Sequence, residues 1–516
     1  MALKRFGPAL AIASSLAVAA STNVFASSLV EVSANPSPYA SCAFGAGSSA
    51  INYTNAEVEP SVAMNPASRT NLIGAWQQDR WSDGGAHGLV AGFSFNGGKS
   101  WSQTDLPFNL CAPGGLNYTR ASDPWVSIGP DGTAYTVSIS FDETDFNNAV
   151  AAATSSDGGE TWQHLNRIIA DTSPQFFNDK ESVTADPTQA GTAYIVWDRL
   201  AFPNNVSRPP SSNPDVALHN FFGFTGPTYF SKTTNGGQTW SSPRVINDVS
   251  SPTPQENQTI GNVIVVDPGS ATRPHALYDF FDAINFSGSN ASGQHGFNVA
   301  FQKSTDFGQT WSTPQLISKL GTVFVTDPNT GQQIRTGDII PEPAIDPATG
   351  QLYVVWQDAR FSGGKFDQVA ISTSSDGGGS WSTPVRVNTP EGQPAFTATV
   401  AVNAEHTVGV TYYDFRELTP TNTTTLPTDY WIKSFSPAQV LSGGIDTGVL
   451  DTHVAGPFNM LAAPFASGFF VGDYEGLTAV GTSFHPFFVQ VNAACNSAPL
   501  SSTCLANRTD VFTDSF

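Results

Sequence analysis

Ser155-Ser156-Asp157-Gly158-Gly159-Glu160-Thr161-Trp162 is one of five copies of the same eight-residue pattern, Ser/Thr-x-Asp/Asn-x-Gly-x-Ser/Thr-Trp. The other four copies are Ser94-Phe95-Asn96-Gly97-Gly98-Lys99-Ser100-Trp101, Thr233-Thr234-Asn235-Gly236-Gly237-Gln238-Thr239-Trp240, Ser304-Thr305-Asp306-Phe307-Gly308-Gln309-Thr310-Trp311 and Ser374-Ser375-Asp376-Gly377-Gly378-Gly379-Ser380-Trp381. The successive tryptophans are 61, 78, 71 and 70 positions apart. A recurrence on this scale predicts a repeat architecture, so the fold is best deduced from the repeat.

The residue types in each copy favour a tight turn followed by an apolar anchor. Asp or Asn hydrogen-bonds backbone amides of its own turn, Gly adopts a positive φ, and Ser or Thr caps the loop. The Trp then enters the next strand and packs as a large apolar side chain between neighbouring units. Each copy is therefore predicted to be a structural turn within a repeating β unit.

These five copies resemble the Asp box of the BNR repeat proteins in the sialidase superfamily, and the resemblance extends over nearly the whole chain. It implies a β-propeller and an exo-α-sialidase-like glycosidase. Sialidases use three arginines for the sialate carboxylate, an Asp as acid/base and a Tyr–Glu pair as nucleophile. They usually have six blades, and their Arg-Ile-Pro motif does not occur near the start of this sequence. The chain also resembles the seven-bladed rhamnose–glucuronate lyases.

Each copy lies near the end of a longer unit whose earlier segments also repeat. A first apolar segment ends at a proline, as at 59–66, 123–130, 181–187, 262–268 and 342–347. A second segment follows a tight turn, at 72–80, 134–142, 193–199, 276–282 and 352–360. A third segment leads into the copy, and a fourth leaves it, as at 244–246 and 385–388. Four short antiparallel strands per unit are typical of a propeller blade.

Two further units lack the eight-residue pattern. One contains apolar segments at 396–403, 408–416 and 430–433, and the last contains only three, at 476–480, 487–491 and 509–513. Residues 29–36 resemble the fourth strand of another unit, 385–390, so the N-terminal strand is predicted to complete the last blade and remove its open edge. The prediction is an all-β, seven-bladed propeller of four-stranded antiparallel blades, with six blades as the alternative.

The N-terminus is typical of a secretory signal peptide over residues 1–26. Lys4 and Arg5 precede a short apolar run, and Val24-Phe25-Ala26 matches a small-residue cleavage site. Residues 27–516 are then expected to be a single sialidase-like propeller domain, secreted, monomeric and without a membrane span. The formal net charge of −21 argues against nucleic acid and anionic membranes as partners.

The four cysteines are predicted to form disulfides rather than a metal site, because no CxxC or CxxH spacing occurs. The simplest pairing is Cys42–Cys111 with Cys495–Cys504. No cofactor is expected. A structural Ca²⁺, or a metal-dependent site at acidic first-strand ends, stays open as an alternative that chelator insensitivity would remove.

The alternating direction of the strands predicts at which of the two ends of a unit each strand end and each copy of the eight-residue pattern lies. The start of the first strand, the end of the second and the second-to-third loop share one end, and the five copies lie at the other. The second strands end in four Asp–Arg pairs, which contain Arg80, Arg199, Arg360 and Arg416. These are interpreted either as repeated salt bridges or as a guanidinium ring that binds a substrate carboxylate. The two interpretations can hold together.

The same end collects acidic, aromatic and histidine side chains. Asp123 and Glu342 begin first strands and are candidate substrate-binding residues, as is His295 in a second-to-third loop. His87, in the corresponding loop of the first unit, is a candidate acid/base, with a solvated or structural role as the alternative. The cluster Gly472-Asp473-Tyr474-Glu475 contributes Tyr474 and Glu475 as further catalytic candidates. His485 precedes a second strand and is expected at the other end.

Three functions fit this residue set. The first is a secreted glycosidase that cleaves a terminal acidic sugar from a glycan. The second is a uronate-specific polysaccharide lyase, in which Arg80 neutralises the carboxylate and His87 removes the proton. The third is a non-catalytic propeller that binds glycan or protein, because a fold does not determine a function.

Overall fold

The computed structural model describes residues 29–45, 50–202, 225–249, 257–285, 296–389, 392–443, 445 and 449–516. The predicted signal peptide and His295 lie outside these ranges. The predicted all-β class is confirmed, because the described chain consists mainly of antiparallel strands with a few short helical turns. Among the described residues, no helix has the length and apolar character that a membrane crossing requires.

The strands follow one another in groups of four, as the sequence predicts. The first two units are β2 (Asn52–Met64), β3 (Leu72–Trp81), β4 (Ala86–Ser94) and β5 (Ser102–Leu106), then β6 (Arg120–Ile128), β7 (Ala134–Phe141), β8 (Asn148–Ser155) and β9 (Gln163–Asp171). The third and fourth are β10 (Phe176–Ala185), β11 (Ala193–Ala201), β12 (Thr228–Thr233) and β13 (Arg244–Asn247), then β14 (Asn257–Asp267), β15 (Ala276–Asn285), β16 (Asn298–Ser304) and β17 (Gln315–Lys319).

The later units continue the pattern. The fifth and sixth are β20 (Glu342–Ile345), β21 (Leu352–Asp358), β22 (Gln368–Ser374) and β23 (Val385–Arg386), then β24 (Ala395–Val402), β25 (Val408–Asp414), β26 (Pro427–Phe435) and β27 (Thr452–Asn459). The seventh contains β29 (Gly476–Val480), β30 (Ser483–Val491) and β31 (Thr509–Thr513). The short helices are η1 (Ala359–Ser362), α2 (Pro437–Leu441), η2 (Met460–Ala462), η3 (Ala493–Cys495) and α3 (Ser502–Ala506).

A small additional sheet interrupts this regular order. It contains β18 (Val325–Thr326) and β19 (Gln333–Arg335), which lie between the fourth and fifth units, and β28 (Phe469–Phe470), which precedes the seventh. β18 and β19 form an antiparallel hairpin, and β19 pairs in parallel with β28. This sheet was not predicted from the repeat.

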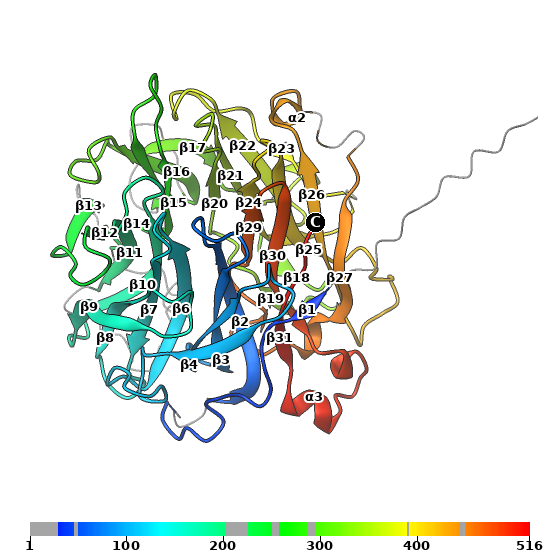
Figure 1. Ribbon diagram of the computed structural model, residues 1–516. Helices are drawn as coiled ribbons and strands as arrows, with labels where there is room; N and C mark the ends of the chain where they lie inside the picture. The colour runs from blue at the N-terminus through cyan, green and yellow to red at the C-terminus, as the bar shows by residue number, and fades with distance from the viewer. Residues whose placement is uncertain are drawn as a thin grey trace, which may run out of the picture.

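The first and last strands of the described chain pair in the seventh unit. β1 (Val30–Glu31) pairs antiparallel with β31, with Val30 opposite Thr513 and Glu31 opposite Phe512. Figure 1 shows this blue strand beside the red C-terminal strands. The predicted closure of the last unit by the N-terminal strand is therefore confirmed, and it covers an edge of β31.

The first strands of the units contact one another in a closed cycle. β2 contacts β6, β6 contacts β10, and the contacts continue through β14, β20, β24 and β29 back to β2. Units three to six are separate four-stranded sheets, whereas isolated bridges join units one, two and seven into one twelve-stranded sheet. The number of blades therefore stays a prediction. The second strands β3 and β21 are buried along their whole length, as expected for strands covered on both faces.

The five copies of the eight-residue pattern adopt the same hydrogen-bonded turn. The first Ser/Thr hydroxyl donates to the Asp/Asn Oδ1 at 2.7–2.9 Å and accepts from the Gly amide at 2.9–3.0 Å. The Asp/Asn Oδ1 also accepts from the amide of the second Ser/Thr at 2.8–3.1 Å. The structural role predicted from these residue types agrees with this geometry. We call these turns the boxes.

The box tryptophans pack against the preceding unit, as predicted. The ring pairs with centroids 5.4–6.4 Å apart are Trp101–Phe487, Trp240–Tyr135, Trp311–Phe230 and Trp381–Phe301. Trp101 of the first unit thereby contacts the seventh unit, so the same kind of packing also joins the last unit to the first. These contacts make the boxes part of the interface between units.

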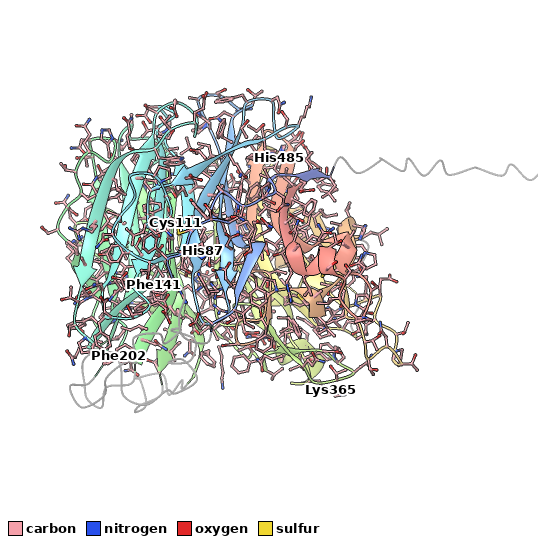
Figure 2. The ribbon with its side chains drawn as sticks, turned by 90° about the horizontal axis from the view of Figure 1, so that it is seen from below. His87, Cys111, Phe141, Phe202, Lys365 and His485 are labelled. Atoms are coloured by element: carbon pink, nitrogen blue, oxygen red, sulfur yellow. A yellow bond between two sulfur atoms is a disulfide. The ribbon has the colours of Figure 1, made fainter. Side chains whose placement is uncertain are left out.

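The boxes lie at the opposite end of the units from the predicted functional residues. In the first unit, Leu72 is opposite Ser94 of the box, whereas Arg80 is opposite Ala86 and Tyr53. Figure 2 shows His485 toward one edge of the molecule and Lys365 and Phe202, which follow second strands, toward the other. An added Cβ at Gly98 of the first box would lie 3.9 Å from His485 Nδ1, so His485 is at the box end, as expected.

Both predicted disulfides are present. Cys42 is bonded to Cys111, which ties the segment after β1 to the connection between β5 and β6, and Cys495 is bonded to Cys504. The described residues contain no free cysteine. Stable disulfides are typical of oxidising compartments outside the cytosol.

Candidate functional site

Five first strands contain a bulge at the end away from the boxes. The pairing register shifts between Val58 and Ser61, and it shifts at the equivalent places in β6, β10, β14 and β24. The bulged residues have positive φ values of 47–68° and are Glu59, Asp123, Lys180, Gly261 and Thr397. A bulge re-aims a side chain locally, and a positive φ is costly for any residue but Gly. Three of these five residues are charged, so the bulges of the first three units aim ionisable side chains at the same end of the units.

The bulges bring charged side chains together around Lys180. Its Nζ lies 3.0 Å from Asp123 Oδ2, 3.3 Å from Glu59 Oε1 and 2.7 Å from Asp473 Oδ2. Asp473 also receives a bidentate contact from Arg335, with Nε 2.9 Å from Oδ1 and Nη2 2.5 Å from Oδ2. We call Glu59, Asp123, Lys180, Arg335 and Asp473 the central cluster. It joins residues from the first, second, third and seventh units and from β19.

Burial and charge set the protonation states in the central cluster. Burial raises the pKa of the Glu59 carboxyl to about 8, although Lys180 acts in the opposite direction. Burial alone would lower the pKa of Lys180, but Asp123, Asp473 and Glu59 raise it well above its ordinary value. Burial would likewise raise the pKa of Asp473, but Arg335 and Lys180 hold it well below the usual range. At neutral pH the cluster therefore combines a protonated carboxyl with an ionised carboxylate and fixed cations.

Arg80 joins this cluster through Gln77. Arg80 Nη1 donates to Gln77 Oε1 at 2.7 Å, and Gln77 Nε2 donates to Glu59 Oε2. The guanidinium of Arg80 lies 4.9 Å from the ring centroid of Phe470, and that of Arg335 lies 4.3 Å from it. Two arginines from distant parts of the chain thus converge on one aromatic ring.

Two small cavities adjoin the central cluster. The first, which we call the rim pocket, is lined by Arg80, Gly84, Gly85, Ser122, Asp123, Ile139, Phe141, Phe177, Asp179, Lys180 and Arg335. The second, the axial cavity, is lined by Asp123, Trp125, Lys180, Glu181, Ser182, Gly261, Asn262, Val263, Ile340, Glu342 and Tyr474. Each encloses about 20 Å³, so each admits a water-sized group. A ligand would therefore insert only one small group into either cavity.

Asp123, Glu342 and Tyr474 are predicted site residues that line the axial cavity. Burial raises the pKa of Glu342 to about 8, and burial also raises the pKa of neighbouring Glu181. The Tyr474 hydroxyl donates to the Pro124 carbonyl at 3.2 Å. Asp123 lines both cavities and contacts Lys180, so it links the predicted site residues to the central cluster.

Glu475 contacts a different set of groups from Tyr474. Its carboxylate accepts from the Tyr413 hydroxyl at 2.9 Å and from the Val489 amide at 3.1 Å. Burial raises its pKa, with smaller lowering contributions from these hydrogen bonds. The structure thus places Glu475 between strands of the sixth and seventh units, while Tyr474 faces the axial cavity. A joint Tyr474–Glu475 nucleophile stays a prediction.

His87 is buried and lies in the same unit as Arg80, but it contacts other side chains. Its Nδ1 lies 3.2 Å from Asp79 Oδ2, and its ring packs edge-on against Trp81 with centroids 5.0 Å apart. Asp79 also accepts a hydrogen bond from the Ser37 hydroxyl at 2.8 Å. His87 is therefore part of a polar contact with the N-terminal segment, and its catalytic role stays a prediction.

The other predicted arginines are held by carboxylates of their own surroundings. Arg199 binds Asp171 at 2.5 Å, Arg360 binds Asp358 at 2.6 Å, and Arg416 binds Asp414 at 2.6 Å. The last two are the repeated Asp-x-Arg salt bridges that the sequence offered as one interpretation. Arg80, with Arg335, lines the rim pocket. These contacts do not bring the four predicted arginines together into a ring of guanidinium groups.

Lys180 and Arg335 were missed in the sequence. Lys180 could have been found by counting back seven residues from the proline that ends each first strand, because Pro66 and Pro130 lead in this way to Glu59 and Asp123, and Pro187 leads to Lys180. No repeat signal exists for Arg335, because it lies in the β18–β19 insertion. Within the described ranges, no three His, Cys, Asp or Glu side chains are placed to hold one metal ion.

Comparison with known proteins gives structural matches only. No protein-family model matches the chain, and no curated protein matches its sequence. An α-L-arabinanase of Penicillium chrysogenum, solved with arabinobiose, is 15% identical, with 69% of this chain and 88% of that chain covered and a TM-score of 0.42.

Two sialidase structures also match. A Hadza microbial sialidase is 14% identical over 87% of this chain and 74% of that one, with a TM-score of 0.38. The leech intramolecular trans-sialidase is 12% identical over 92% and 70%, with a TM-score of 0.39. With TM-scores below 0.5, these matches carry no argument about function, which is argued from the site alone.

Proposed function

We propose that this chain is a secreted glycoside hydrolase on a seven-bladed β-propeller, which removes a terminal acidic sugar from a glycan. The observation that carries the proposal is the contact of Lys180 with Glu59, Asp123 and Asp473 next to the rim pocket. The closed cycle of seven first strands supports the blade count. Two disulfides support secretion of the single domain.

The roles are assigned from the raised pKa of Glu59 and from the position of Asp123 at the rim pocket. Most glycosidases use a protonated carboxylic acid to protonate the leaving oxygen and a carboxylate as base or nucleophile. Glu59, whose pKa burial raises to about 8, is the proposed proton donor, and Asp123, which lines the pocket beside Lys180, is the proposed base or nucleophile. Lys180 holds both groups in place and does not itself exchange a proton, since its pKa is raised well above 10.5.

An acidic sugar suits the two arginines at the rim pocket. Arg80 and Arg335 both line it, and guanidinium groups bind carboxylates in a bidentate manner. The enclosed volume matches a substituent such as a carboxylate rather than a whole ring. The expected partner is therefore a glycan that ends in sialic acid or a uronic acid.

A lyase reaction is the second candidate, favoured by one contact. His87 Nδ1 is paired with Asp79, and such a carboxylate orients an imidazole for proton transfer. Arg80, the next residue after Asp79, would then neutralise the uronate carboxylate. A β-elimination leaves a conjugated product that absorbs ultraviolet light, whereas hydrolysis leaves none.

The test is an assay of the purified protein on three substrates. Sialyllactose and a glucuronate-capped polysaccharide are the acidic substrates, and arabino-oligosaccharide is the neutral control. Release of the acidic monosaccharide without ultraviolet absorbance supports the hydrolase, and a rise in absorbance identifies the lyase. Binding of the acidic glycans without any product would refute both enzyme proposals and support the binding-only alternative.

A further inference from the structure

Two buried glutamates that the proposed hydrolysis does not use line the axial cavity. Glu181 and Glu342 have only 3% and 6% of their surface exposed. Both carboxyl oxygens of Glu181, and Oε1 of Glu342, have no hydrogen-bond partner among the described residues. A buried carboxyl oxygen without a partner is costly to the folded state. The cavity therefore offers three acceptors to a ligand.

Glu181 lies in the bulge of β10. The register of this strand shifts between Asp179 and Ser182, so that Lys180 and Glu181 together form the bulge. The corresponding second residues of the other four bulges are uncharged, and they are Pro60, Pro124, Asn262 and Ala398. A bulge at this position therefore does not require a carboxyl group, and Glu181 is a feature of the third unit alone among these five.

The charges around the axial cavity favour a cation. Asp123, Glu181 and Glu342 line it, and Lys180 is the only basic residue among the described residues of the lining. Lys180 is already paired with three carboxyl groups of the central cluster. The carboxyl groups of Glu181 and Glu342 are therefore left without an ion-pair partner among the described residues.

The size and lining of the cavity suit a primary ammonium group better than a metal ion. Its volume of about 20 Å³ admits one water-sized group. Calcium takes about six to eight oxygen ligands, and no three His, Cys, Asp or Glu side chains of the described chain are placed to hold one metal ion. A primary ammonium has three N–H donors, which equals the number of unpartnered carboxyl oxygens on Glu181 and Glu342.

Lys180 shows how these surroundings hold an ammonium group. Its Nζ contacts the three carboxyl groups and lies 5.7 Å from the ring centroid of Tyr474. Tyr474 also lines the axial cavity, as does Trp125, and their ring centroids are 5.2 Å apart. Aromatic faces attract cations. A ligand ammonium in the cavity would thus meet the same kinds of partner, carboxyl oxygens and aromatic rings.

We propose that the axial cavity binds a primary ammonium group through the carboxyl groups of Glu181 and Glu342. The proposal goes beyond the proposed function, because it adds a cationic ligand beside the rim pocket. Two sources can supply this chemistry. One is the free ammonium ion, and the other is an amine such as that of an amino sugar, of which only the nitrogen would enter the cavity.

The binding test measures the melting temperature in the absence of any glycan. Ammonium chloride or methylammonium chloride replaces potassium chloride stepwise at constant ionic strength. Potassium is the matched control, because it has the charge and nearly the size of ammonium but no N–H donor. A ligand that binds only the folded protein stabilises it, so the melting temperature should rise by about 2 °C and then level off.

The two cations distinguish the sources. A saturable rise with methylammonium supports an amine ligand, and a rise with ammonium alone identifies the free ion. The absence of a saturable rise with both cations would overturn the proposal. The proposed hydrolysis is tested separately, since no glycan is present, so either result leaves the other question open.

The variant Glu181→Gln is expected to abolish the rise, because it removes the charge and replaces one acceptor by a donor. Glu57→Gln is the matched control. Glu57 is also buried and has an unpartnered Oε2, but it lines neither cavity, so its variant should keep the wild-type rise. If Glu181→Gln fails to fold, Glu342→Gln replaces it. A folded variant with an undiminished rise contradicts the proposal.

The rise should also grow with pH. Burial raises the pKa of Glu342 to about 8, and burial together with Asp123 raises the pKa of Glu181, so a cation that binds these groups displaces protons from them. The other ionisable groups that line the cavity or contact Lys180 are Asp123, Lys180, Tyr474, Glu59 and Asp473. The rise in melting temperature should be larger at about pH 8 than at about pH 6. An equal rise at both would contradict binding by the two glutamates.

Discussion

The two ends of the units shift the pKa values of their acidic side chains in opposite directions. At the box end, five turns repeat the same hydrogen bonds on exposed aspartates and asparagines, and the pKa of Asp306 and Asp376 is lowered to about 2, chiefly by Thr310 and Ser380. At the cluster end, the equivalent bulge positions carry Glu59, Asp123, Lys180, Gly261 and Thr397, and burial raises the pKa of Glu59 to about 8. The box end thus repeats one residue set, whereas equivalent positions at the cluster end differ in charge and size, as we expect of the end that is proposed to carry the active site.

The largest effect is expected for Glu59→Gln. This change removes the proposed proton donor but keeps its shape, so the turnover of the acidic substrate should fall about 10²–10⁴-fold. The control is Glu57→Gln on the same strand, because buried Glu57 contacts Gln78 and does not belong to the central cluster. Its activity should stay within about threefold of wild type. Equal losses in the two variants would refute the assignment of the acid.

Lys180→Met should have the largest effect on stability. It leaves Asp123 and Asp473 buried without their shared cation, and breaking a buried ion pair on one side costs about 3–5 kcal/mol. Chemical denaturation measures the loss. Lys232→Met at the box end is the control, since Lys232 Nζ donates to the uncharged Phe307 carbonyl and its loss should cost about 1 kcal/mol. A smaller loss for Lys180→Met than for the control would contradict the role given to the central cluster.

A pair of adjacent glycines in the third box measures the contact between units. A Cβ at Gly237 would meet Thr154 Cγ2 of the second unit at 2.3 Å, whereas a Cβ at Gly236 would meet nothing within 4 Å. Both residues have positive φ values, +75° and +69°, so both alanine variants carry similar backbone strain. Gly237→Ala should therefore lower the free energy of unfolding by about 1–3 kcal/mol more than Gly236→Ala. Identical losses would show that the box acts only within its own unit.

The smallest effect concerns the pH dependence of stability, which should differ in sign between the two ends. Glu59 has a folded pKa raised from 4.5 to about 8, so its contribution is full below pH 4.5 and is lost as the pH rises to about 8. Asp376 has a folded pKa lowered from 3.8 to about 2, so its contribution is full above pH 3.8 and is lost as the pH falls to about 2.

Melting temperatures measured from pH 2 to 9 would show both trends. Glu59→Gln should flatten the alkaline side of the profile only. Asp376→Asn, which installs the residue that the first and third boxes already carry at this position, should flatten the acidic side only. A change on the other side in either variant would contradict these assignments.

Features that repeat along the chain could be predicted from the sequence, whereas features that occur only once in the described chain could not. The boxes, the strand order, the two disulfides and the closure by β1 follow from local patterns and from strand direction, so they could be predicted. Lys180 was not predicted as a site residue because its neighbour Glu181 fits the start of an ordinary strand. It is the bulge that brings Lys180 to the central cluster. Arg335 was not predicted as a site residue because the β18–β19 hairpin that carries it has no counterpart in the other described units. Its position depends on the long-range pairing of β19 with β28.

The arginine prediction shows the same limit. Four second strands end in an Asp and an Arg at similar spacing, yet Arg360 and Arg416 fold back on their own carboxylates while Arg80 reaches Gln77. Spacing along a strand predicts the end at which a side chain lies. It does not predict which of several nearby carboxylates a flexible guanidinium binds.

Because β1 pairs with β31, the ring of units is held closed by strand pairing and not by a covalent bond. Residues 30 and 513 face each other across one ladder, so a short peptide could join the two ends without disturbing any strand. New ends could then be opened in a box loop, for example beside Gly236, where the surface has room. Such a circular permutant would carry every inter-unit contact described above and would move only the place where synthesis of the ring begins.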